Sequence, residues 1–369
     1  MSRLAIRQLI ETAGYRLSDP PILQPADVFL DLAGEDIRTR LFTTQDADGR
    51  ELCLRPELTI PVCRQHIDNG DPARRANYGY LGPVFRHRPT DSGEFLQAGV
   101  ESIGRTDREA ADAEILSLAL SIARAGGLIH PKVTIGDTAV LERFCDGLGL
   151  TAHQARRLRR SVGERARMEE AVTALAETCG ASDAGEAGLL AAIRGGGPDA
   201  ARALVEDLIQ LAGIKAVGGR TAGEIAERFL DKAESMAAPA LSREALQVLG
   251  DLVALEVPFN EAPEAVVALA SEAGIAIDDV VAAMEARLAA CAERGMDLAS
   301  MTFSGAYGGR LDYYTGFAFE FRNREDVLAG PAVSGGRFDR LMELLGAGRS
   351  VPAIGAAVWI DRLPRGNEP

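Results

Sequence analysis

Strand-like stretches lie toward both ends of the chain and are separated by a long helical stretch. Strand patterns occur within 42–54, where a turn at 46–49 predicts a hairpin, and within 95–103, and sheet character returns near Leu298 and continues to Arg322. Between 151 and 250 the chain is rich in alanine and broken by glycine, which favours helices joined by turns. This order predicts an α+β fold in which one antiparallel sheet domain is split in sequence around an inserted all-helical domain.

The pattern divides the chain into three parts. We expect residues 1–150 to form the first part of the sheet domain, 151–250 the helical insert and 251–369 the second part of the sheet domain. A chain of 369 residues is long enough for one large core and a smaller second domain.

The overall charge argues against a polyanionic partner. The chain has 40 basic and 54 acidic residues, and its formal net charge of -14 repels nucleic acid at long range. Arginines do cluster within 156–167, but acidic residues follow them closely, which favours a solvated helix face over a nucleic-acid site. We therefore expect no nucleic-acid partner.

Membrane, disulfide and metal proteins are also disfavoured. No apolar run approaches the roughly 18–20 residues that span a bilayer, and no apolar stretch follows the charged N-terminus. We expect a soluble, cytoplasmic protein with no membrane partner. The five cysteines are scattered without metal-ligand spacing, which predicts reduced thiols, no metal site and no cofactor.

One expected strand has two chemically different faces. In the stretch 95–103, Gln97, Gly99 and Glu101 share one face, because successive side chains of a strand point to opposite sides. The other face is apolar. We therefore expect a polar wall with a gap at the glycine.

The segment that follows this strand predicts a helix start. Thr106-Asp107-Arg108-Glu109 matches a capping box, in which Thr106 would be the N-cap. Apolar residues then recur at helical spacing from Ala111 to Ile122.

Three stretches combine polar side chains with strand or turn context, namely 54–59, 82–101 and 308–316. Carboxylates such as Glu57 and Glu101 and a phenol such as Tyr314 suit a ligand with an ammonium group or an imidazole N–H. Taken singly, each of these residues is by default a structural partner. The residues alone indicate a small-molecule pocket and leave its use open.

Five motifs follow one another along the chain. They are Leu54-Arg55-Pro56-Glu57, Gly82-Pro83-Val84-Phe85-Arg86-His87, Leu311-Asp312-Tyr313-Tyr314-Thr315-Gly316, Gly335-Gly336-Arg337-Phe338-Asp339, and Val351-Pro352-Ala353-Ile354-Gly355 with Asp361-Arg362-Leu363. Their order and spacing resemble histidyl-tRNA synthetase. In that family a six-stranded antiparallel sheet binds ATP and histidine, and the core dimerises through its first motif, here the segment around Gly14, Tyr15 and Pro21. The resemblance implies a class II aminoacyl-tRNA synthetase-like sheet flanked by helices.

The resemblance also implies which residues bind histidine. Glu57 and Thr59 would meet the amino group, Gln97 and Glu101 would line the site, and Tyr314 would approach the imidazole. The full histidine-binding set that the resemblance implies is Glu57, Thr59, Arg86, Gln97, Glu101, Tyr313 and Tyr314.

The nucleotide side of the synthetase pattern is altered at four places. No glutamate follows His87, where the loop is shortened to residues 90–93, and Gly309 stands where the family has an arginine, with Arg310 displaced by one residue. Trp359 stands where the family has a glycine, and seven residues follow Arg362. Because adenylation depends on placed cationic groups, we expect ATP to be excluded or misplaced and no residue to be catalytic. The family continues past its last motif with an anticodon-binding domain, which we expect this chain to lack.

A synthetase-like core with these losses resembles the regulatory subunit of ATP phosphoribosyltransferase. The resemblance implies a homodimer within a hetero-oligomer, assembled with a short-form catalytic subunit that performs the first step of histidine biosynthesis. It also implies feedback by histidine, which requires a coupling free energy between two sites. Two alternatives stay open: a truncated but active histidyl-tRNA synthetase, and a synthetase-like module that binds another amino acid or partner.

Overall fold

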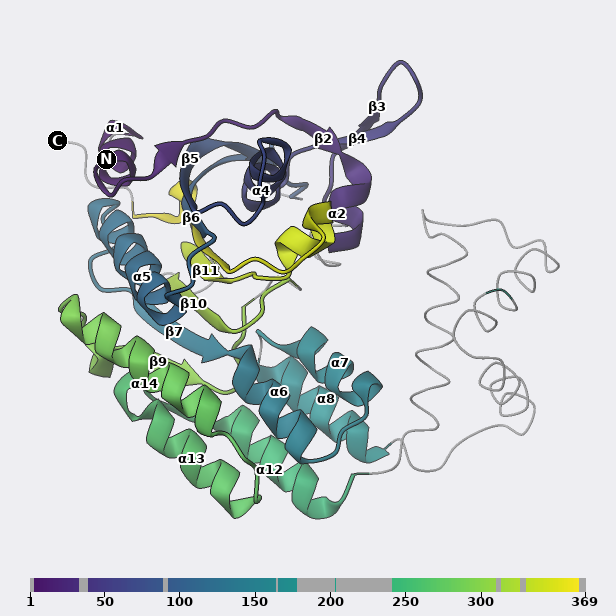
Figure 1. Cartoon of the computed structure of the whole chain (residues 1–369), viewed down its shortest axis with the longest axis vertical. Helices are drawn as coiled ribbons and strands as arrows, with labels where there is room; N and C mark the ends of the chain where they lie inside the picture. The colour runs from purple at the N-terminus through teal and green to yellow at the C-terminus, as the bar shows by residue number, and fades with distance from the viewer. Residues whose placement is uncertain are drawn as a thin grey trace.

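A nine-stranded sheet is the centre of the computed structural model, which describes residues 3–32, 39–88, 92–163, 165–177, 203, 241–309, 313–325 and 330–364 (Figure 1). The strand order is β1-β5-β6-β12-β11-β10-β7-β9-β8. The strands are β1 (Arg16–Leu17), β5 (Ala76–Phe85), β6 (Glu94–Ile103), β7 (Lys132–Asp137), β8 (Glu256–Pro258), β9 (Thr302–Ser304), β10 (Phe317–Arg322), β11 (Val333–Arg337) and β12 (Ala353–Trp359).

Six neighbouring strands of this sheet pair with one another in antiparallel orientation, in the order β5-β6-β12-β11-β10-β7. This confirms the antiparallel sheet that the sequence predicts. The outer pairs are mixed, because β1 runs parallel to β5 and β9 runs parallel to β7. A smaller antiparallel sheet holds β2 (Leu23–Pro25), β3 (Thr43–Gln45) and β4 (Glu51–Leu54). The turn between β3 and β4 forms the expected hairpin.

Helices cover both faces of the large sheet, and further helices form a layer beside it (Figure 1). Helix α5 packs on β12 and β11, and α14 packs on α5, while α4 lies on the opposite face. The helices are α1 (Arg3–Thr12), α2 (Ala26–Leu32), α4 (Thr59–Asp68), α5 (Arg108–Ala125), α6 (Thr138–Gly147), α7 (Ala152–Ser161), α8 (Arg165–Glu177), α12 (Arg243–Ala254), α13 (Ala262–Glu272) and α14 (Asp278–Glu293).

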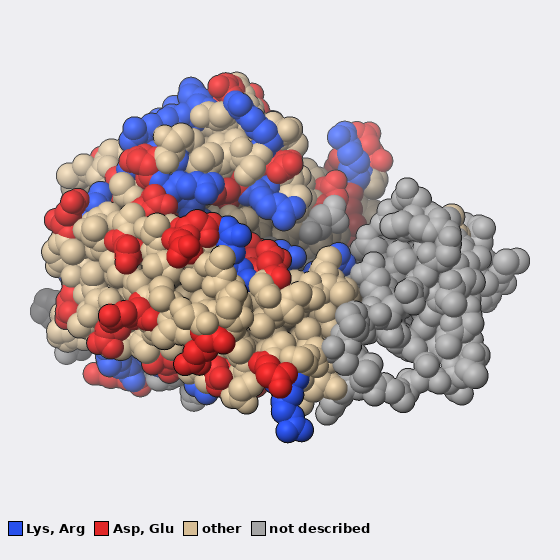
Figure 2. All heavy atoms as spheres, turned by 60° about the horizontal axis from the view of Figure 1, so that its bottom comes forward, with Lys and Arg blue, Asp and Glu red and all other residues tan. Residues whose placement is uncertain are grey.

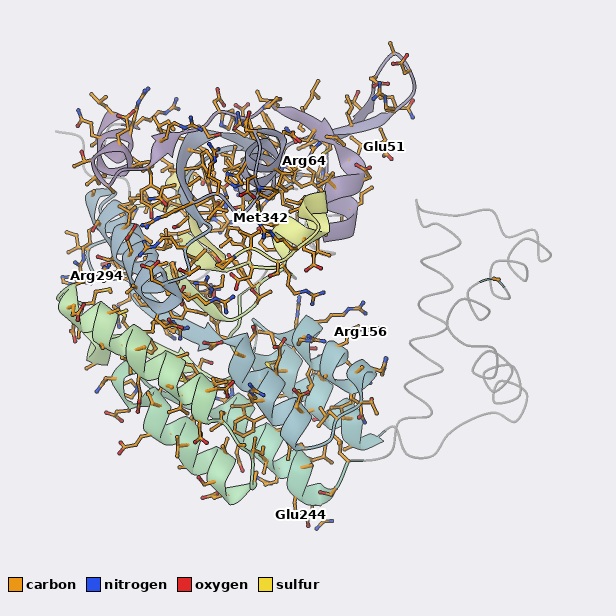
Figure 3. All side chains as sticks on the ribbon, in the orientation of Figure 1. Glu51, Arg64, Arg156, Glu244, Arg294 and Met342 are labelled. Atoms are coloured by element: carbon orange, nitrogen blue, oxygen red, sulfur yellow. The ribbon has the colours of Figure 1, made fainter. Side chains whose placement is uncertain are left out.

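The two faces of β6 bury different kinds of residue. Ala98 and Val100 join the apolar core under α5, whereas the opposite face lies in a second core with Tyr80 and Met342. Figure 3 shows Met342 inside this part of the molecule, while Glu51 and Arg294 lie at its periphery. Strand alternation therefore places the polar residues of β6 between the sheet and α4.

The predicted capping box at the start of α5 is wrong. The helix begins at Arg108, and the N-cap residue Asp107 makes no side-chain capping hydrogen bond. Its carboxylate accepts from the Arg105 guanidinium, which also binds Glu114. An ion pair between neighbours therefore displaces the cap.

The described ends of the predicted insert pack into the main core. Leu158 of α7, Met168 of α8 and Leu249 of α12 are all fully buried there. The predicted boundary at residue 250 falls inside α12, and residues 178–202 and 204–240 lie outside the described residues, so the domain division stays a prediction.

The arginines at the start of the insert pair with acidic neighbours. Arg159 lies 3.1 Å from Glu142, and Arg165 lies 2.8 Å from Glu169. Figure 2 shows the face that carries α12, α13 and α14, where separate acidic side chains lie among uncharged ones. Among the described helices, none is long and apolar enough to cross a membrane.

Candidate functional site

Glu57 closes the first turn of α4. Its carboxylate accepts hydrogen bonds from the backbone N–H groups of Thr59, at 2.6 Å, and Ile60, at 2.8 Å, which the helix itself leaves unbonded. Complete burial raises the pKa of Glu57, and the two N–H groups oppose that shift by favouring the carboxylate. Glu57 is therefore a buried acidic group that is held rigidly by the backbone.

Glu101 faces Glu57 from the middle of β6. One carboxylate oxygen, Oε1, accepts from the hydroxyl of Thr59 at 2.7 Å and from the phenol of Tyr80 at 3.1 Å. Burial and the nearby Glu57 raise the pKa of Glu101 to about 8, although the hydrogen bonds from Thr59 and Tyr80 oppose the shift. The other oxygen, Oε2, is buried and has no hydrogen-bond partner among the described residues.

The floor of the site consists of glycines on neighbouring strands. Gly355 of β12 pairs with Glu101, and a Cβ at Gly355 would lie 1.6 Å from Glu101 Oε2. A Cβ at Gly99 would lie 2.3 Å from the Tyr80 hydroxyl. The gap that the sequence predicts at Gly99 is therefore filled by the Tyr80 phenol, which is a correction to the expected open wall.

Two tyrosines lie next to the carboxyl groups and close the site. The rings of Tyr313 and Tyr314 lie 5.5 Å apart between centroids, and the Tyr313 hydroxyl is buried without a partner among the described residues. Burial raises the pKa of both phenols, and Glu57 and Glu101 are near enough to raise each further. Both side chains therefore remain neutral donors next to two carboxyl groups.

Gly309 lies directly against the ring of Tyr314. Its φ of +89° belongs to the left-handed region, and a Cβ there would lie 2.1 Å from the Tyr314 ring. A side chain at this position is incompatible with Tyr314 in its place. Gly309 therefore leaves the space that the Tyr314 ring occupies, while Arg310, Leu311 and Asp312 lie outside the described residues.

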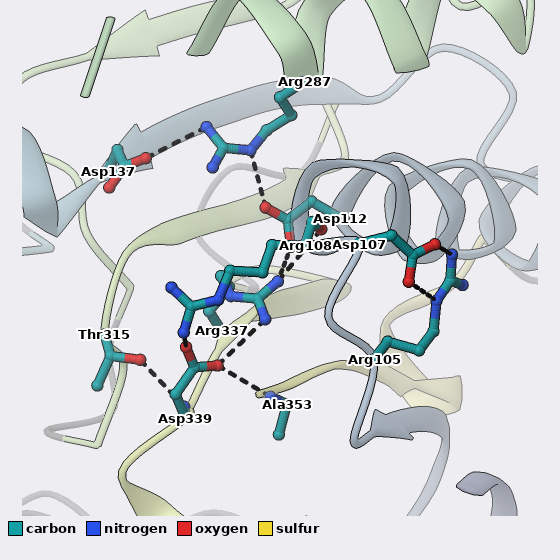
Figure 4. A network of polar contacts seen from close by, with 10 residues as sticks. All are labelled: Arg105, Asp107, Arg108, Asp112, Asp137, Arg287, Thr315, Arg337, Asp339 and Ala353. Carbon is teal, nitrogen blue, oxygen red and sulfur yellow. Dashed lines mark hydrogen bonds and ion pairs between the residues drawn. The ribbon is translucent and has the colours of Figure 1, made fainter. Parts of the chain in front are cut away.

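A buried charge network anchors the segment that carries these tyrosines (Figure 4). The backbone N–H of Asp339 donates to the Thr315 hydroxyl at 3.0 Å, and Arg337 binds both Asp339 and Asp112. Arg287 of α14 donates to Asp112 at 2.9 Å and to Asp137 at 3.2 Å. The network joins α14, α5, β7 and β11 immediately beside the tyrosines.

Arg86 and Gln97 complete the set of polar residues at the site. The Arg86 side chain donates from Nε to the carbonyl of Pro56 at 2.7 Å and lies 5.7 Å from the centroid of the Phe95 ring. Gln97 pairs with Trp359 across β6 and β12, and its amide oxygen is buried without a partner among the described residues. Arg86 also lies near Glu57 and opposes the rise in the pKa of that carboxyl group.

The structure brings all seven residues of the expected site to one face of the sheet. Sequence reasoning missed Tyr80, although its alternation with Tyr78 along β5 was available as a signal. It also assigned no role to Arg55, whose buried guanidinium binds the carbonyls of Pro83 and Pro20 and packs over Gly82. Arg55 therefore holds the start of the site, and its guanidinium lies on the face of the sheet that carries Gln97.

The chemistry of the site favours binding. Its unpartnered acceptors, Glu101 Oε2 and Gln97 Oε1, suit N–H donors of a ligand. Burial raises the pKa of the nearby Cys63 well above its usual range, so that its thiol stays protonated. No cluster of His, Cys, Asp and Glu that would suit a metal ion occurs among the described residues.

Comparisons with known proteins agree on one family. The family model described as histidyl-tRNA synthetase matches residues 2–227 and 202–363. The ATP phosphoribosyltransferase regulatory subunit of Chelativorans sp. (strain BNC1) is 40% identical over 96% of this chain and 94% of its own length. The protein of the same name from Rhizobium meliloti (strain 1021) is 41% identical over 94% of this chain and 91% of its own length.

Solved structures show the same fold. An ATP phosphoribosyltransferase regulatory subunit/histidyl-tRNA synthetase from Bacillus halodurans C matches with a TM-score of 0.63 at 22% identity, over 97% of this chain and 76% of the other. Histidyl-tRNA synthetase from Nostoc sp. PCC 7120 matches with a TM-score of 0.62 at 16% identity, over 97% of this chain and 68% of the other. These two similarities support the class II synthetase-like architecture.

Proposed function

This chain belongs to the family of ATP phosphoribosyltransferase regulatory subunits, and on that premise we propose that it is the non-catalytic subunit of a hetero-oligomeric ATP phosphoribosyltransferase. Its partner is a short-form catalytic subunit that carries out the phosphoribosyl transfer, a glycosyltransferase reaction that opens histidine biosynthesis. The complex is cytoplasmic and contains this chain as a homodimer. Neither nucleic acid nor a membrane takes part.

The ligand of the candidate site is histidine, which acts as the feedback signal. The observation that carries this proposal is the buried pair Glu57 and Glu101, joined through Thr59, beside the two neutral phenols of Tyr313 and Tyr314. A carboxylate with one unbonded oxygen suits an ammonium group or an imidazole N–H, since both are donors that lose water on entering.

Loss of the nucleotide side supports a regulatory role over an enzymatic one. Gly309 contributes no cation where charge would develop on a phosphate, and Trp359 places a large ring at the end of β12. The site therefore retains groups for an amino acid and lacks groups for its activation. A histidine-dependent exchange of pyrophosphate into ATP by this chain would instead favour the truncated synthetase.

The deciding experiment measures the short-form catalytic subunit alone, with this chain, and with this chain plus histidine. We expect co-purification, an increase in phosphoribosyl transfer when the chain is added, and inhibition when histidine is added. Lack of both activation and co-purification would refute the proposal. The variants Glu101→Gln and Tyr314→Phe assign the site, because unchanged histidine affinity and inhibition in both would remove histidine from this pocket.

A further inference from the structure

Trp359 is the only tryptophan of the chain and lies beside the candidate site. It is the last residue of β12 and pairs directly with Gln97 of β6, so the two side chains stand next to each other on one face of the sheet. Gly99 and Glu101 continue the same face of β6. The indole therefore lies on the same buried side of the sheet as the two carboxyl groups.

The indole and the amide have complementary hydrogen-bonding atoms that are both unused. Trp359 Nε1–H is a donor, Gln97 Oε1 is an acceptor, and each is buried with no partner among the described residues. A buried polar atom without a partner is unfavourable, so a ligand that supplies both missing partners gains affinity. An α-amino acid carries both partners on neighbouring groups, because its carboxylate accepts hydrogen bonds and its ammonium donates them.

The charges around the site give such a ligand a direction. The guanidinium carbon of Arg362 lies 5.1 Å from the centroid of the Trp359 ring, and Arg86 lies over Phe95 on the same face of β6. Arg86 also lies near Glu57, whereas Glu101 lies four residues further along β6 than Gln97. A zwitterion lowers its electrostatic energy by placing its carboxylate toward Trp359 and Arg362 and its ammonium on the side of Gln97 that faces Glu101.

We propose that Trp359 donates its indole N–H to the free α-carboxylate of the bound amino acid, and that this contact restricts the pocket to free amino acids. The inference rests on the proposed histidine site and adds to it a residue that determines specificity. A carboxylate joined to a nucleotide or reduced to an alcohol lacks the charge that this contact recognises. The Trp359 ring thus occupies space that a nucleotide would need, and its N–H binds the carboxylate.

The test compares ligands that differ only at the carboxylate. Binding of histidine and of histidinol, in which an alcohol replaces the carboxylate, is measured by calorimetry for the full chain and for Trp359→Phe, which keeps an aromatic ring but lacks the N–H. We expect the variant to lose at least tenfold in histidine affinity and less than twofold in histidinol affinity. The fluorescence of the single tryptophan should change with histidine in the unmodified chain.

Equal losses for both ligands would overturn the inference, because the ring would then act by packing alone. An unchanged histidine affinity in the variant would also overturn it. If the unmodified chain does not bind histidine, the proposed ligand itself is wrong, and the two failures are distinguishable. If Trp359→Phe does not fold, binding of histidine and of its methyl ester to the unmodified chain provides the test. Equal affinities for the two ligands would refute a contact with the free carboxylate.

Discussion

Glu101 is a carboxyl group whose surroundings disfavour its charged form. It is completely buried, it lies near Glu57, and only one of its oxygens is hydrogen-bonded by Thr59 and Tyr80. Its pKa is raised from 4.5 to about 8. Folding therefore favours the protonated carboxyl group, whereas the unfolded chain ionises at lower pH.

This shift predicts a pH-dependent loss of stability. A raised pKa contributes stability that is complete below the unfolded value of 4.5 and is lost as the pH rises through about 8. Glu101→Gln, which mimics the protonated form, should have the same free energy of unfolding as the unmodified chain near pH 4.5. Near pH 8 the variant should be more stable than the unmodified chain by about 1–3 kcal/mol. Urea unfolding across this range measures the difference, and parallel curves would contradict the expected ionisation.

The capping box shows why a residue motif can fail in its own context. Thr106-Asp107-Arg108-Glu109 fits the motif, but Arg105 binds the Asp107 carboxylate and also reaches Glu114, which lies two turns into α5. Sequence spacing shows which partners are possible. It does not show which of two local partners has the lower free energy.

At the scale of elements, strands and helices were predictable and their pairing was not. The alternation in β6 and the hairpin of β3 and β4 depend on neighbours in sequence, and both are confirmed. The contact between Gly99 and Tyr80 depends on the register of β5 against β6, which a single sequence does not contain. The candidate residues could therefore be named while the filled gap between them could not.

The same substitution should have opposite effects at two glycines, one in a strand and one in a helix. Gly99→Ala should destabilise the fold by about 1–3 kcal/mol, because the added Cβ would lie 2.3 Å from Tyr80 and 2.4 Å from the carbonyl of Ala356. Gly250→Ala, inside α12 with open space around it, should stabilise by about 0.5–1 kcal/mol. Chemical denaturation of both variants compares them. Equal effects at the two sites would contradict the packing described.

The buried network of α5, α14 and β11 should be sensitive to removal of one charge. Asp112→Asn should destabilise the chain by about 3–5 kcal/mol, because Arg287 and Arg337 would keep buried charges without their shared carboxylate. Glu11→Gln, in the exposed pair with Arg7, should change stability by less than about 1 kcal/mol. Thermal unfolding distinguishes the two, and a small effect at Asp112 would show that the network is dispensable.

For the whole molecule, the same network joins the helical layer to the pocket. Arg287 belongs to α14, and it is connected through Asp112 and Arg337 to Asp339, whose backbone binds Thr315. Thr315 follows Tyr314 directly in the chain. Movement of the helical layer therefore has a continuous path of polar contacts to the tyrosines that close the site.

Histidine binding should stabilise the entire fold. A ligand at a hundredfold excess over its dissociation constant adds about 2.7 kcal/mol to the free energy of unfolding if the unfolded chain does not bind it. We expect the melting temperature of the unmodified chain to rise with histidine and that of Glu101→Gln to stay nearly constant. Differential scanning fluorimetry across a histidine titration measures both, and an equal rise in the variant would remove Glu101 from the binding contacts.

The glycine floor limits how this pocket can change over evolutionary time. Gly99, Gly309 and Gly355 leave the space that Tyr80, Tyr314 and Glu101 occupy, and every possible replacement is larger. Single substitutions at these positions can therefore displace a side chain of the site, but none can add space to it. A lineage that gains a side chain at one of them must rearrange the site in the same step, whereas a lineage that needs a larger site must move a strand.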